Sequence, residues 1–398
     1  MINLDLLLQR ELEELKIRGL FREMKRIDGA QGPTVTIDDK DVILLSSNNY
    51  LGLASHPEVI KAQIRASEEF GAGSCASRLI SGNMTLHEKL EKKIAGFKGS
   101  ESAILFPTGY MTNVGVISAL VGQGDVIVCD KLNHASIIDG ARLSGALLRT
   151  YPHKNLEKLE AILEKSSSYR KRLVITDGVF SMDGDIAPIP EIIEISQKFD
   201  AILMLDDAHA TGVLGKNGKG TCEYFGIKEG VHVHMGTFSK ALGNLGGYVA
   251  GSETLIEYIR NKARAFIYST ALPPAVVSGA IKSIEIVEKD AGLREKLWSN
   301  VKRFRDALIE LNFDIMDTKT QIIPIYTGDA LSTMKAAEFL LKKGVFAPGI
   351  RPPTVSKMRC RIRASLMATH TQDHINRAIE AFRGLKDEQG KRVFCNRD

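Results

Sequence analysis

The sequence predicts an α/β protein in which a mainly parallel central sheet carries helices on both faces and is followed by a smaller α+β C-terminal domain. Between residues 57 and 290, short and almost continuously apolar segments alternate with segments of helical periodicity. Strands that helices cover on both sides have this composition, because neither face of the sheet meets water. The 398 residues also exceed what one hydrophobic core usually organises, which favours two domains.

Five apolar segments are expected to form strands of this sheet. Each is four or five residues long and is bounded by turn residues: Ala103–Phe106, Asp125–Cys129, Arg172–Thr176, Ala201–Leu205 and Val231–Met235. A helix is expected from Thr85 to about Gly99. Thr85 and Glu88 match a capping box, and Gly99 matches a helix stop.

The two ends of the chain differ in texture from this central part. Residues 1–56 are expected to hold an amphipathic helix, with Leu8, Leu12 and Leu15 on one face, and a hairpin that turns at 38–41. Residues 291–398 hold two helical and two strand patterns, and their polar tail is expected to fray. We therefore expect an N-terminal segment at 1–56, a large domain at 57–290 and a small domain at 291–398.

The composition argues against several classes of partner. Hydrophobic residues make up 44%, charged residues 25%, and the net charge is +5, with no basic stripe interleaved with aromatics, so nucleic-acid binding is not expected. No apolar run is long enough to span a membrane. The five cysteines are scattered and never spaced CxxC, which favours reduced thiols in the cytoplasm over disulfides or a zinc site.

The chemistry of the chain is expected where strands end. In open α/β sheets, ligands bind beyond the carboxyl ends of the strands. Asp206 ends one predicted strand, and Lys240 follows another in a loop of small residues. An amine that can form an imine and a carboxylate that keeps a pyridine nitrogen protonated are what an enzyme needs to hold pyridoxal phosphate. A lysine met alone is more often a solvated surface charge.

Three further loops fall at such strand ends, and each has a plainer alternative. Gly109 could let the start of a helix approach a phosphate, or could serve an ordinary turn. His134 could stack on an aromatic ring, or could merely begin a helix. Ser181 could reach the ring or its phenolic oxygen, or could belong to a polar turn closed by Gly184. No metal site is expected at Asp206, since no partner carboxylate or DxD spacing accompanies it.

With these loops in this order, the chain resembles the fold-type I pyridoxal-phosphate-dependent transferases and, among them, the α-oxoamine synthases. The resemblance covers nearly the whole chain and is specific. It is carried by Ser46–Leu53, Asn133–Ser136, Asp177–Gly184, Asp206–Gly212, Thr237–Lys240 and Arg361–Arg363. It implies an acyltransferase that condenses an amino acid with an acyl thioester and releases carbon dioxide.

The resemblance also implies roles for individual residues. Lys240 would form the imine with pyridoxal 5'-phosphate, Asp206 would pair with the ring nitrogen, and His134 would stack on the ring. The other cofactor contacts implied are Gly109, Tyr110, Ser181, His209, Thr237 and Thr270, the last reaching the site of the neighbouring subunit in a homodimer. The substrate contacts implied are Arg22, Asn48, His134, Arg363 and Ser365, with Arg363 clamping the amino-acid carboxylate.

Two branches of the family fit these motifs. Asp206–Gly215, Ile267–Thr270 and Ile350–Val355 look most like the branch that condenses L-alanine with a pimeloyl thioester, carried by CoA or an acyl carrier protein, in biotin biosynthesis. The alternative branch joins glycine to acetyl-CoA and shares Asn133–Gly140 and Asp177–Gly184. Ser365 stands where the family usually has threonine, which bears on acyl-chain selectivity rather than on the chemistry.

Overall fold

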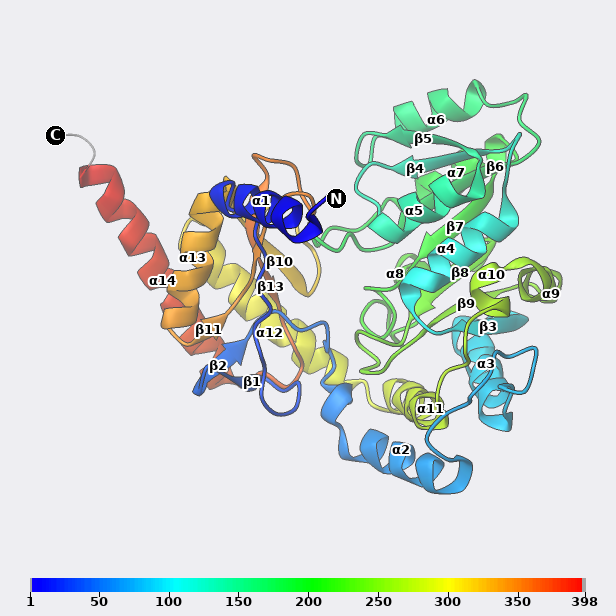
Figure 1. Cartoon of the computed structure of the whole chain (residues 1–398), viewed down its shortest axis with the longest axis horizontal. Helices are drawn as coiled ribbons and strands as arrows, with labels where there is room; N and C mark the ends of the chain where they lie inside the picture. Colours follow the sequence, from blue (N-terminus) through cyan, green and yellow to red (C-terminus); the bar gives the residue numbers. More distant parts are fainter. Residues whose placement is uncertain (1, 396–398) are drawn as a thin grey trace. The chain divides into compact units, whose positions relative to one another are not determined.

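The computed structural model describes residues 2–395, and the side-chain surroundings of residues 2–388 (Figure 1). The chain divides into two compact units, and each is described by itself. The large unit comprises residues 48–181 and 185–296. The small unit comprises residues 1–47, 182–184 and 297–398.

Helices and strands alternate regularly between residues 85 and 237 of the large unit. In chain order, the elements are α1 (Leu4–Ile17), β1 (Thr34–Ile37), β2 (Lys40–Leu44), the short 3-10 helix η1 (Leu53–Ser55), α2 (Pro57–Phe70), α3 (Thr85–Lys98), β3 (Ser102–Phe106), α4 (Gly109–Leu120), β4 (Val126–Asp130), α5 (Ala135–Ser144), β5 (Leu147–Tyr151), α6 (Leu156–Glu164), β6 (Arg172–Asp177), α7 (Ile189–Lys198), β7 (Ile202–Asp206), α8 (Thr221–Phe225), β8 (Val233–Thr237), β9 (Gly247–Gly251), α9 (Glu253–Lys262), α10 (Arg264–Ile267), α11 (Pro274–Lys289), α12 (Gly292–Glu310), β10 (Ile322–Gly328), α13 (Ala330–Lys342), β11 (Val345–Phe346), β12 (Gly349–Ile350), β13 (Cys360–Ser365) and α14 (Gln372–Cys395).

The large unit is built on a seven-stranded sheet in the order β3-β9-β8-β7-β6-β4-β5. The pairs β8–β7, β7–β6, β6–β4 and β4–β5 are parallel. β9 runs antiparallel to both of its neighbours, β3 and β8. The predicted α/β fold with a mainly parallel sheet is therefore confirmed, with one reversed strand.

Alternate residues of each strand enter two separate cores, one on each face of the sheet. Ile127 and Cys129 of β4 pack in the core that α4, α5, α9 and α10 cover. Val126 and Val128 of the same strand pack in the core that α6 and α7 cover. Because both faces are buried, the strands carry apolar residues at nearly every position, which explains the composition of the sequence. Beyond the sheet, α2 and α11 lie side by side (Figure 1).

All five predicted strands exist, each displaced by two residues or fewer. Two strands of this sheet lacked a sequence prediction. β5 lies at the edge of the sheet, and its exposed Arg149 and Thr150 break the apolar run that marks a buried strand. β9 begins and ends with glycine and follows a glycine-rich loop, so its composition is typical of a turn.

The small unit contains two three-stranded sheets, β1-β2-β11 and β10-β13-β12. The predicted hairpin is confirmed as β1 and β2, with Asp38 and Asp39 at positive φ in its turn. β2 also pairs in parallel with β11, which lies about 300 residues later in the chain. The first 47 residues consequently group with residues 297–398 rather than forming the separate segment 1–56 that the sequence suggested.

α1 confirms the predicted N-terminal helix, and Leu8, Leu12 and Leu15 of its apolar face are exposed. Two other predictions about helices need correction. α3 ends as expected at Gly99, but its first turn is capped by the His87 ring, which accepts the amide hydrogen of Met84; Glu88 binds Asn83 instead. α14 continues to Cys395, so the expected frayed tail is helical that far, and residues 396–398 lie outside the described residues.

Candidate functional site

A cavity of about 230 Å³ opens where β3, β4, β6, β7 and β8 of the large unit end. It is lined by residues from these strand ends and the loops that follow them: Thr108, Gly109, Tyr110, Asn113, His134, Ser136, Asp177, Ser181, Asp206, Ala208, His209, Met235, Thr237, Ser239 and Lys240. The carboxyl ends of neighbouring strands meet at one edge of a sheet, so five loops that are far apart in sequence converge there. Eight of the residues predicted from the sequence line this one cavity.

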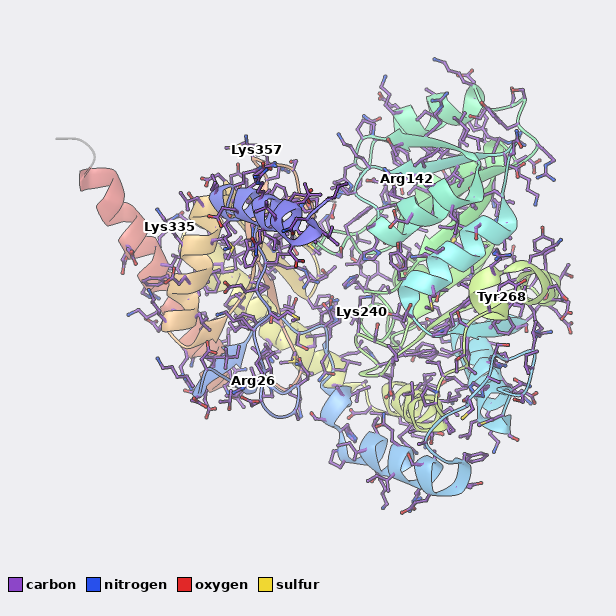
Figure 2. All side chains as sticks on the ribbon, viewed as in Figure 1. Arg26, Arg142, Lys240, Tyr268, Lys335 and Lys357 are labelled. Atoms are coloured by element: carbon purple, nitrogen blue, oxygen red, sulfur yellow. The ribbon has the colours of Figure 1, made fainter. Side chains whose placement is uncertain are left out.

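Lys240 follows β8 and contributes the only lysine amine among the residues that line the cavity. Its Nζ lies 3.5 Å from Oγ1 of Thr237, which is the last residue of β8. Thr237 is buried, whereas Lys240 is half-buried. Lys240 is labelled within the large unit in Figure 2. A short strand thus brings an amine and a hydroxyl to the same wall of the cavity.

Asp206 is the last residue of β7, and both of its carboxylate oxygens accept hydrogen bonds. Oδ2 accepts from Nδ2 of Asn113 at 2.8 Å, and Oδ1 accepts from the backbone amide of Ala208 at 2.9 Å. Asn113 lies on α4, on the face of the helix that covers the sheet. Two donors from different elements therefore fix the orientation of a buried carboxylate.

His134 caps the start of α5, and the buried Asp177 holds its backbone. The amide of His134 donates to Oδ2 of Asp177 at 2.8 Å, while Asn133 donates to the carbonyl of Ile175 on β6. The His134 side chain is exposed at the cavity wall, as a ring that stacks on a bound ligand would have to be. Desolvation lowers the pKa of His134 and outweighs the opposing charge of Asp206. Burial and the neighbouring charge of Asp206 raise the pKa of Asp177 well above its usual range.

His209 enters the cavity from the loop after β7 and is held by a tyrosine from a distant part of the sequence. Nδ1 of His209 lies 2.7 Å from the hydroxyl of Tyr50, and that hydroxyl donates to Oδ1 of Asn48 at 3.0 Å. Tyr50 is fully buried. Asn48, predicted to bind substrate, does not line the cavity but is connected to it through these two contacts.

The start of α4 presents backbone amides at the cavity wall. Thr108 caps the helix by accepting the amide hydrogen of Met111, and the helix geometry leaves the amides of Gly109 and Tyr110 without intrahelical acceptors. A Cβ atom on Gly109 would lie 2.4 Å from Cγ2 of Thr237, so only glycine lets the helix approach β8 this closely. Helix amides beside a threonine hydroxyl suit a phosphate group.

The adjacent carboxylate, Asp207, supports the loop rather than the cavity. It pairs with Lys98 at 3.1 Å and accepts hydrogen bonds from the amide and hydroxyl of Thr221. Both charged side chains of this pair are almost fully buried. Asp206 and Asp207 thus point to different partners, and among residues 2–388 no cluster of three or more His, Cys, Asp or Glu side chains could hold a metal ion.

Three predicted site residues, Arg22, Arg363 and Ser365, belong to the small unit, and a fourth, Thr270, belongs to the large unit. Arg363 and Ser365 are buried on β13 of the small unit, where Nη1 of Arg363 donates to Oγ of Ser365 at 2.9 Å. Arg22, also in the small unit, donates to the carbonyl of Pro352 at 3.1 Å. Thr270 belongs to the large unit, where it bridges to Ser77, and does not line the cavity. In Figure 2, Tyr268 lies well away from Lys240.

Asn113, Ser136 and Asp177 are among the polar residues of the cavity wall that were not predicted as site residues. Asn113 and Ser136 sit inside helices, and Asp177 was noted only as the start of a loop. One signal pointed to Asn113: a side chain with four hydrogen-bonding sites stands in a mostly apolar helix that begins at the predicted phosphate loop. The free thiols of Cys75, Cys129, Cys222 and Cys360 contribute nothing to the cavity. No helix in the described part of the chain has the length and apolar character needed to cross a membrane.

Comparisons with known proteins agree with this geometry. Residues 40–382 match the model of the family "Aminotransferase class I and II". The chain is 51% identical over 385 residues to the 8-amino-7-oxononanoate synthase of Citrifermentans bemidjiense, covering 96% of this chain and 98% of that protein. It is 50% identical to the 8-amino-7-oxononanoate synthase of Bacillus pumilus, covering 97% of each chain.

Solved structures give the same result at the level of the fold. A variant of the serine palmitoyltransferase of S. paucimobilis, solved with a bound PLP–myriocin aldimine, has a TM-score of 0.93 and 32% identity, covering 98% of this chain and 100% of that one. An 8-amino-7-oxononanoate synthase from Francisella tularensis has a TM-score of 0.77 and 29% identity, covering 87% and 98%. On these matches and the geometry of its cavity, the chain belongs to the class I and II aminotransferase family and, within it, to the 8-amino-7-oxononanoate synthases.

Proposed function

We propose that the protein is a pyridoxal 5'-phosphate-dependent acyltransferase. It condenses L-alanine with a pimeloyl thioester of CoA or acyl carrier protein, and it releases carbon dioxide and the free thiol to give 8-amino-7-oxononanoate for biotin biosynthesis. The observation that carries the proposal is that Lys240, Asp206 and His134 line one cavity beside the backbone amides at the start of α4. Relatives about 50% identical to this chain carry the name of that enzyme.

The cavity fits pyridoxal phosphate in the chemistry of its donors. Gly109, Tyr110 and Thr237 would hold the phosphate, and Asp206 would hold the protonated ring nitrogen, as its fixed carboxylate suits. Ser181 and His209 would contact the ring and its phenolic oxygen. The cofactor, bound through its aldehyde to the Lys240 amine, supplies a sink for the electrons of the substrate's α-carbon.

The side chains of this chain handle orientation and protons. Asp206 keeps the ring nitrogen charged, because its two hydrogen bonds hold the carboxylate in place. The Lys240 amine would take a proton from the α-carbon of the bound amino acid and would return a proton to the product. Its 3.5 Å contact with the hydroxyl of Thr237 keeps the amine near the end of β8. His134 would cover the ring face at the cavity wall.

The substrate carboxylate needs a separate partner, and Arg363 is proposed for it. A guanidinium can bind a carboxylate through two parallel hydrogen bonds, and this grip decides which bond of the α-carbon is broken. Asn48, Arg22 and Ser365 are proposed as further substrate contacts. We further propose a cytoplasmic homodimer in which Thr270 of each subunit serves the phosphate of the other. The free thiols of Cys75, Cys129, Cys222 and Cys360 support a reducing compartment.

A substrate matrix tests the reaction. Purified protein with pyridoxal phosphate is mixed with glycine, L-alanine or L-serine and with acetyl-CoA, pimeloyl-CoA or palmitoyl-CoA, and the release of free CoA is measured. We expect the largest kcat/KM for L-alanine with pimeloyl-CoA, and mass spectrometry should identify 8-amino-7-oxononanoate. A larger kcat/KM for glycine with acetyl-CoA would overturn the proposed substrates and assign the alternative branch.

Replacing the amine tests the site. Lys240→Ala should remove the visible absorbance of the imine and lower kcat by at least about 10³-fold, because both the covalent attachment and the proton acceptor are lost. The matched control is Lys216→Ala, which removes an exposed lysine of the large unit and should leave both measurements unchanged. An imine band that survives in Lys240→Ala would show that another amine holds the cofactor.

A further inference from the structure

We propose that Asn113 is a positioning residue that orients Asp206 and, through Ser136, fixes the ring hydrogen of His134 on Nε2. The proposal deepens the proposed function, since it concerns the groups that would face the cofactor. Its evidence is a continuous chain of hydrogen bonds that joins Asp206, Asn113, Ser136 and His134 across three elements of the large unit.

Asn113 stands at the centre of this chain. Its side chain is 1% exposed, and its Nδ2 donates to Oδ2 of Asp206 at 2.8 Å and to Oγ of Ser136 at 2.9 Å. The amide group has two hydrogens, and both are used by these two acceptors. The opposite orientation of the amide would turn Oδ1 of Asn113 toward the carboxylate of Asp206, so electrostatics determines which end of the amide faces the site.

The acceptor end of the same amide has a different environment. Oδ1 of Asn113 is buried, and no residue among 2–388 donates a hydrogen bond to it. A buried carbonyl oxygen without a hydrogen-bond partner is unfavourable. If this position served only packing, an apolar side chain of similar size would avoid that cost. The two donated hydrogen bonds are therefore the physical reason for an amide at this position.

The hydrogen atoms of the next two groups follow from what each atom can donate. The backbone amide of Ser136 lies 3.3 Å from Nδ1 of His134, and an amide can only donate. The hydroxyl of Ser136 already accepts from Asn113, so its own hydrogen is free for Nδ1 of His134, 2.7 Å away. Nδ1 consequently accepts from both groups and carries no hydrogen, and a neutral His134 ring must carry its hydrogen on Nε2.

The surroundings of His134 keep the ring neutral. Desolvation lowers the pKa of His134; the carboxylate of Asp206 opposes this effect, and the ammonium group of Lys240 adds to it. Nε2 donates to no residue within 2–388, so this hydrogen is available to a molecule in the cavity. His134 thus offers a hydrogen-bond donor at the cavity wall, whereas the other tautomer would offer an acceptor there.

Asn113 sets the direction of the whole chain. If it did not donate to Ser136, only the long 3.3 Å contact from the backbone amide of Ser136 would still favour an unprotonated Nδ1, and the serine hydroxyl could turn and accept a hydrogen from Nδ1 of His134. Asn113→Asp should enforce that reversal. An ionised carboxylate at this position accepts from Ser136, and a protonated one would donate its hydrogen to Asp206 and still accept from Ser136 with a lone pair of the same oxygen, because one terminal atom of the side chain contacts both groups. In both forms the serine hydroxyl is drawn away from His134.

The test is the tautomer of His134, read by NMR of protein labelled with ¹⁵N in its histidine rings, both free of pyridoxal phosphate and saturated with it. His134→Asn identifies the signal by its loss. In the unchanged protein we expect a ring with Nε2 protonated and Nδ1 unprotonated. In Asn113→Asp we expect the opposite tautomer to gain the larger share. Ser118→Ala, on the same helix but bonded only to backbone carbonyls, should leave the His134 signal unchanged.

Two further variants keep the proposal testable if Asn113→Asp does not fold. Asn113→Leu retains a similar volume and removes the donor, so a mixture of tautomers is expected. Ser136→Ala removes the hydroxyl but leaves the contact between Asn113 and Asp206, so a mixture is expected again, with a smaller loss of cofactor affinity than in Asn113→Leu. Far-ultraviolet circular dichroism and thermal unfolding identify which variants are folded.

The outcomes separate this proposal from the proposed function. An unchanged protein with the hydrogen on Nδ1, or folded variants at Asn113 that keep the original tautomer, would overturn it whatever reaction the protein catalyses. If the tautomer responds as expected while no substrate pair releases CoA, the positioning role stands and the proposed function fails. For cofactor affinity, we expect a rise in Kd for pyridoxal phosphate of more than about tenfold in Asn113→Asp, because a second carboxyl group is placed beside Asp206.

Discussion

The start of α4 lies so close to β8 that position 109 requires a glycine, and a substitution can test this requirement. A Cβ at this position would lie 2.4 Å from Cγ2 of Thr237, which no real pair of carbon atoms tolerates. Gly109→Ala should therefore push the helix from the strand and weaken the proposed phosphate site. We expect the Kd for pyridoxal phosphate, measured by absorbance titration, to rise about 5- to 150-fold, since overpacking of this kind costs about 1–3 kcal/mol.

A second substitution at the same contact should restore the cofactor affinity that Gly109→Ala loses. Thr237→Ser removes the Cγ2 methyl group and keeps the hydroxyl, so adding it to Gly109→Ala should restore most of the lost affinity. Gly96→Ala is the control, because a Cβ on this helical glycine of α3 meets no atom within 4 Å. A double variant that binds the cofactor no better than Gly109→Ala would show that the methyl contact is not what requires glycine.

Single residues at strand ends were predictable from the sequence, whereas the residues that hold them in place by hydrogen bonds were not. Asp206 ends β7 and Lys240 lies in the loop after β8, where the topology of an α/β sheet places ligand-binding groups. The support given to His209 by Tyr50 joins positions 159 residues apart, and no local pattern reports such a contact. Asn113 was missed because it lies within a helix and not at the end of a strand, where ligand-binding groups are expected.

At the scale of elements, His153 ties together the ends of β4, β5 and β6. Its Nδ1 lies 3.1 Å from each carboxylate oxygen of Asp130, at the end of β4, and its Nε2 lies 2.8 Å from Oδ2 of Asp185, in the loop after β6. Burial alone would lower the pKa of His153, but the hydrogen bonds to Asp130 and Asp185 outweigh it and raise the pKa to about 9. His153 is therefore charged at neutral pH and bridges two carboxylates.

This bridge predicts a pH dependence of stability. A group whose pKa is raised on folding, here from 6.5 to about 9, stabilises the fold fully below pH 6.5 and loses that contribution as the pH rises through about 9. Between these limits, the free energy of unfolding of the cofactor-free protein should fall by up to about 3 kcal/mol more than in His153→Gln. Denaturant titrations at several pH values measure this difference, and parallel pH profiles for the two proteins would refute it.

The strands that were predicted from the sequence are those whose residues are buried on both faces of the sheet. The central strands β4, β6 and β7 are covered on both faces and were found, whereas the edge strand β5 and the glycine-bounded β9 were not. The antiparallel direction of β9 could not be predicted either, because apolar composition indicates that a strand is buried but not in which direction it runs. The end of α3 was predictable from Gly99, a residue whose positive φ stops a helix.

At the scale of the whole molecule, the pairing of β2 with β11 joins the two ends of the chain in one unit. Nothing in the sequence of either strand identifies the other, since β11 is two residues long and lies next to a helix. The division into units therefore depends on contacts of very long sequence separation. A resemblance that spans the whole chain carried the family and its reaction class, which local patterns alone would have left open.

The proposed dimer gives the last test. Thr270 does not line the cavity of its own chain, and a threonine that serves a phosphate must then belong to the site of a neighbouring subunit. Thr270→Glu should repel that phosphate and strongly reduce activity, and Lys240→Ala should abolish it. When the two variants are unfolded, mixed in equal amounts and refolded, half of the dimers should combine one subunit of each kind. Each mixed dimer then holds one site with both an intact Lys240 and an intact Thr270, so roughly a quarter of wild-type activity should return. Mixing either variant with itself controls for refolding. A mixture no more active than its two components would place Thr270 outside the partner's site, because a residue that acts only within its own chain cannot be complemented by another subunit.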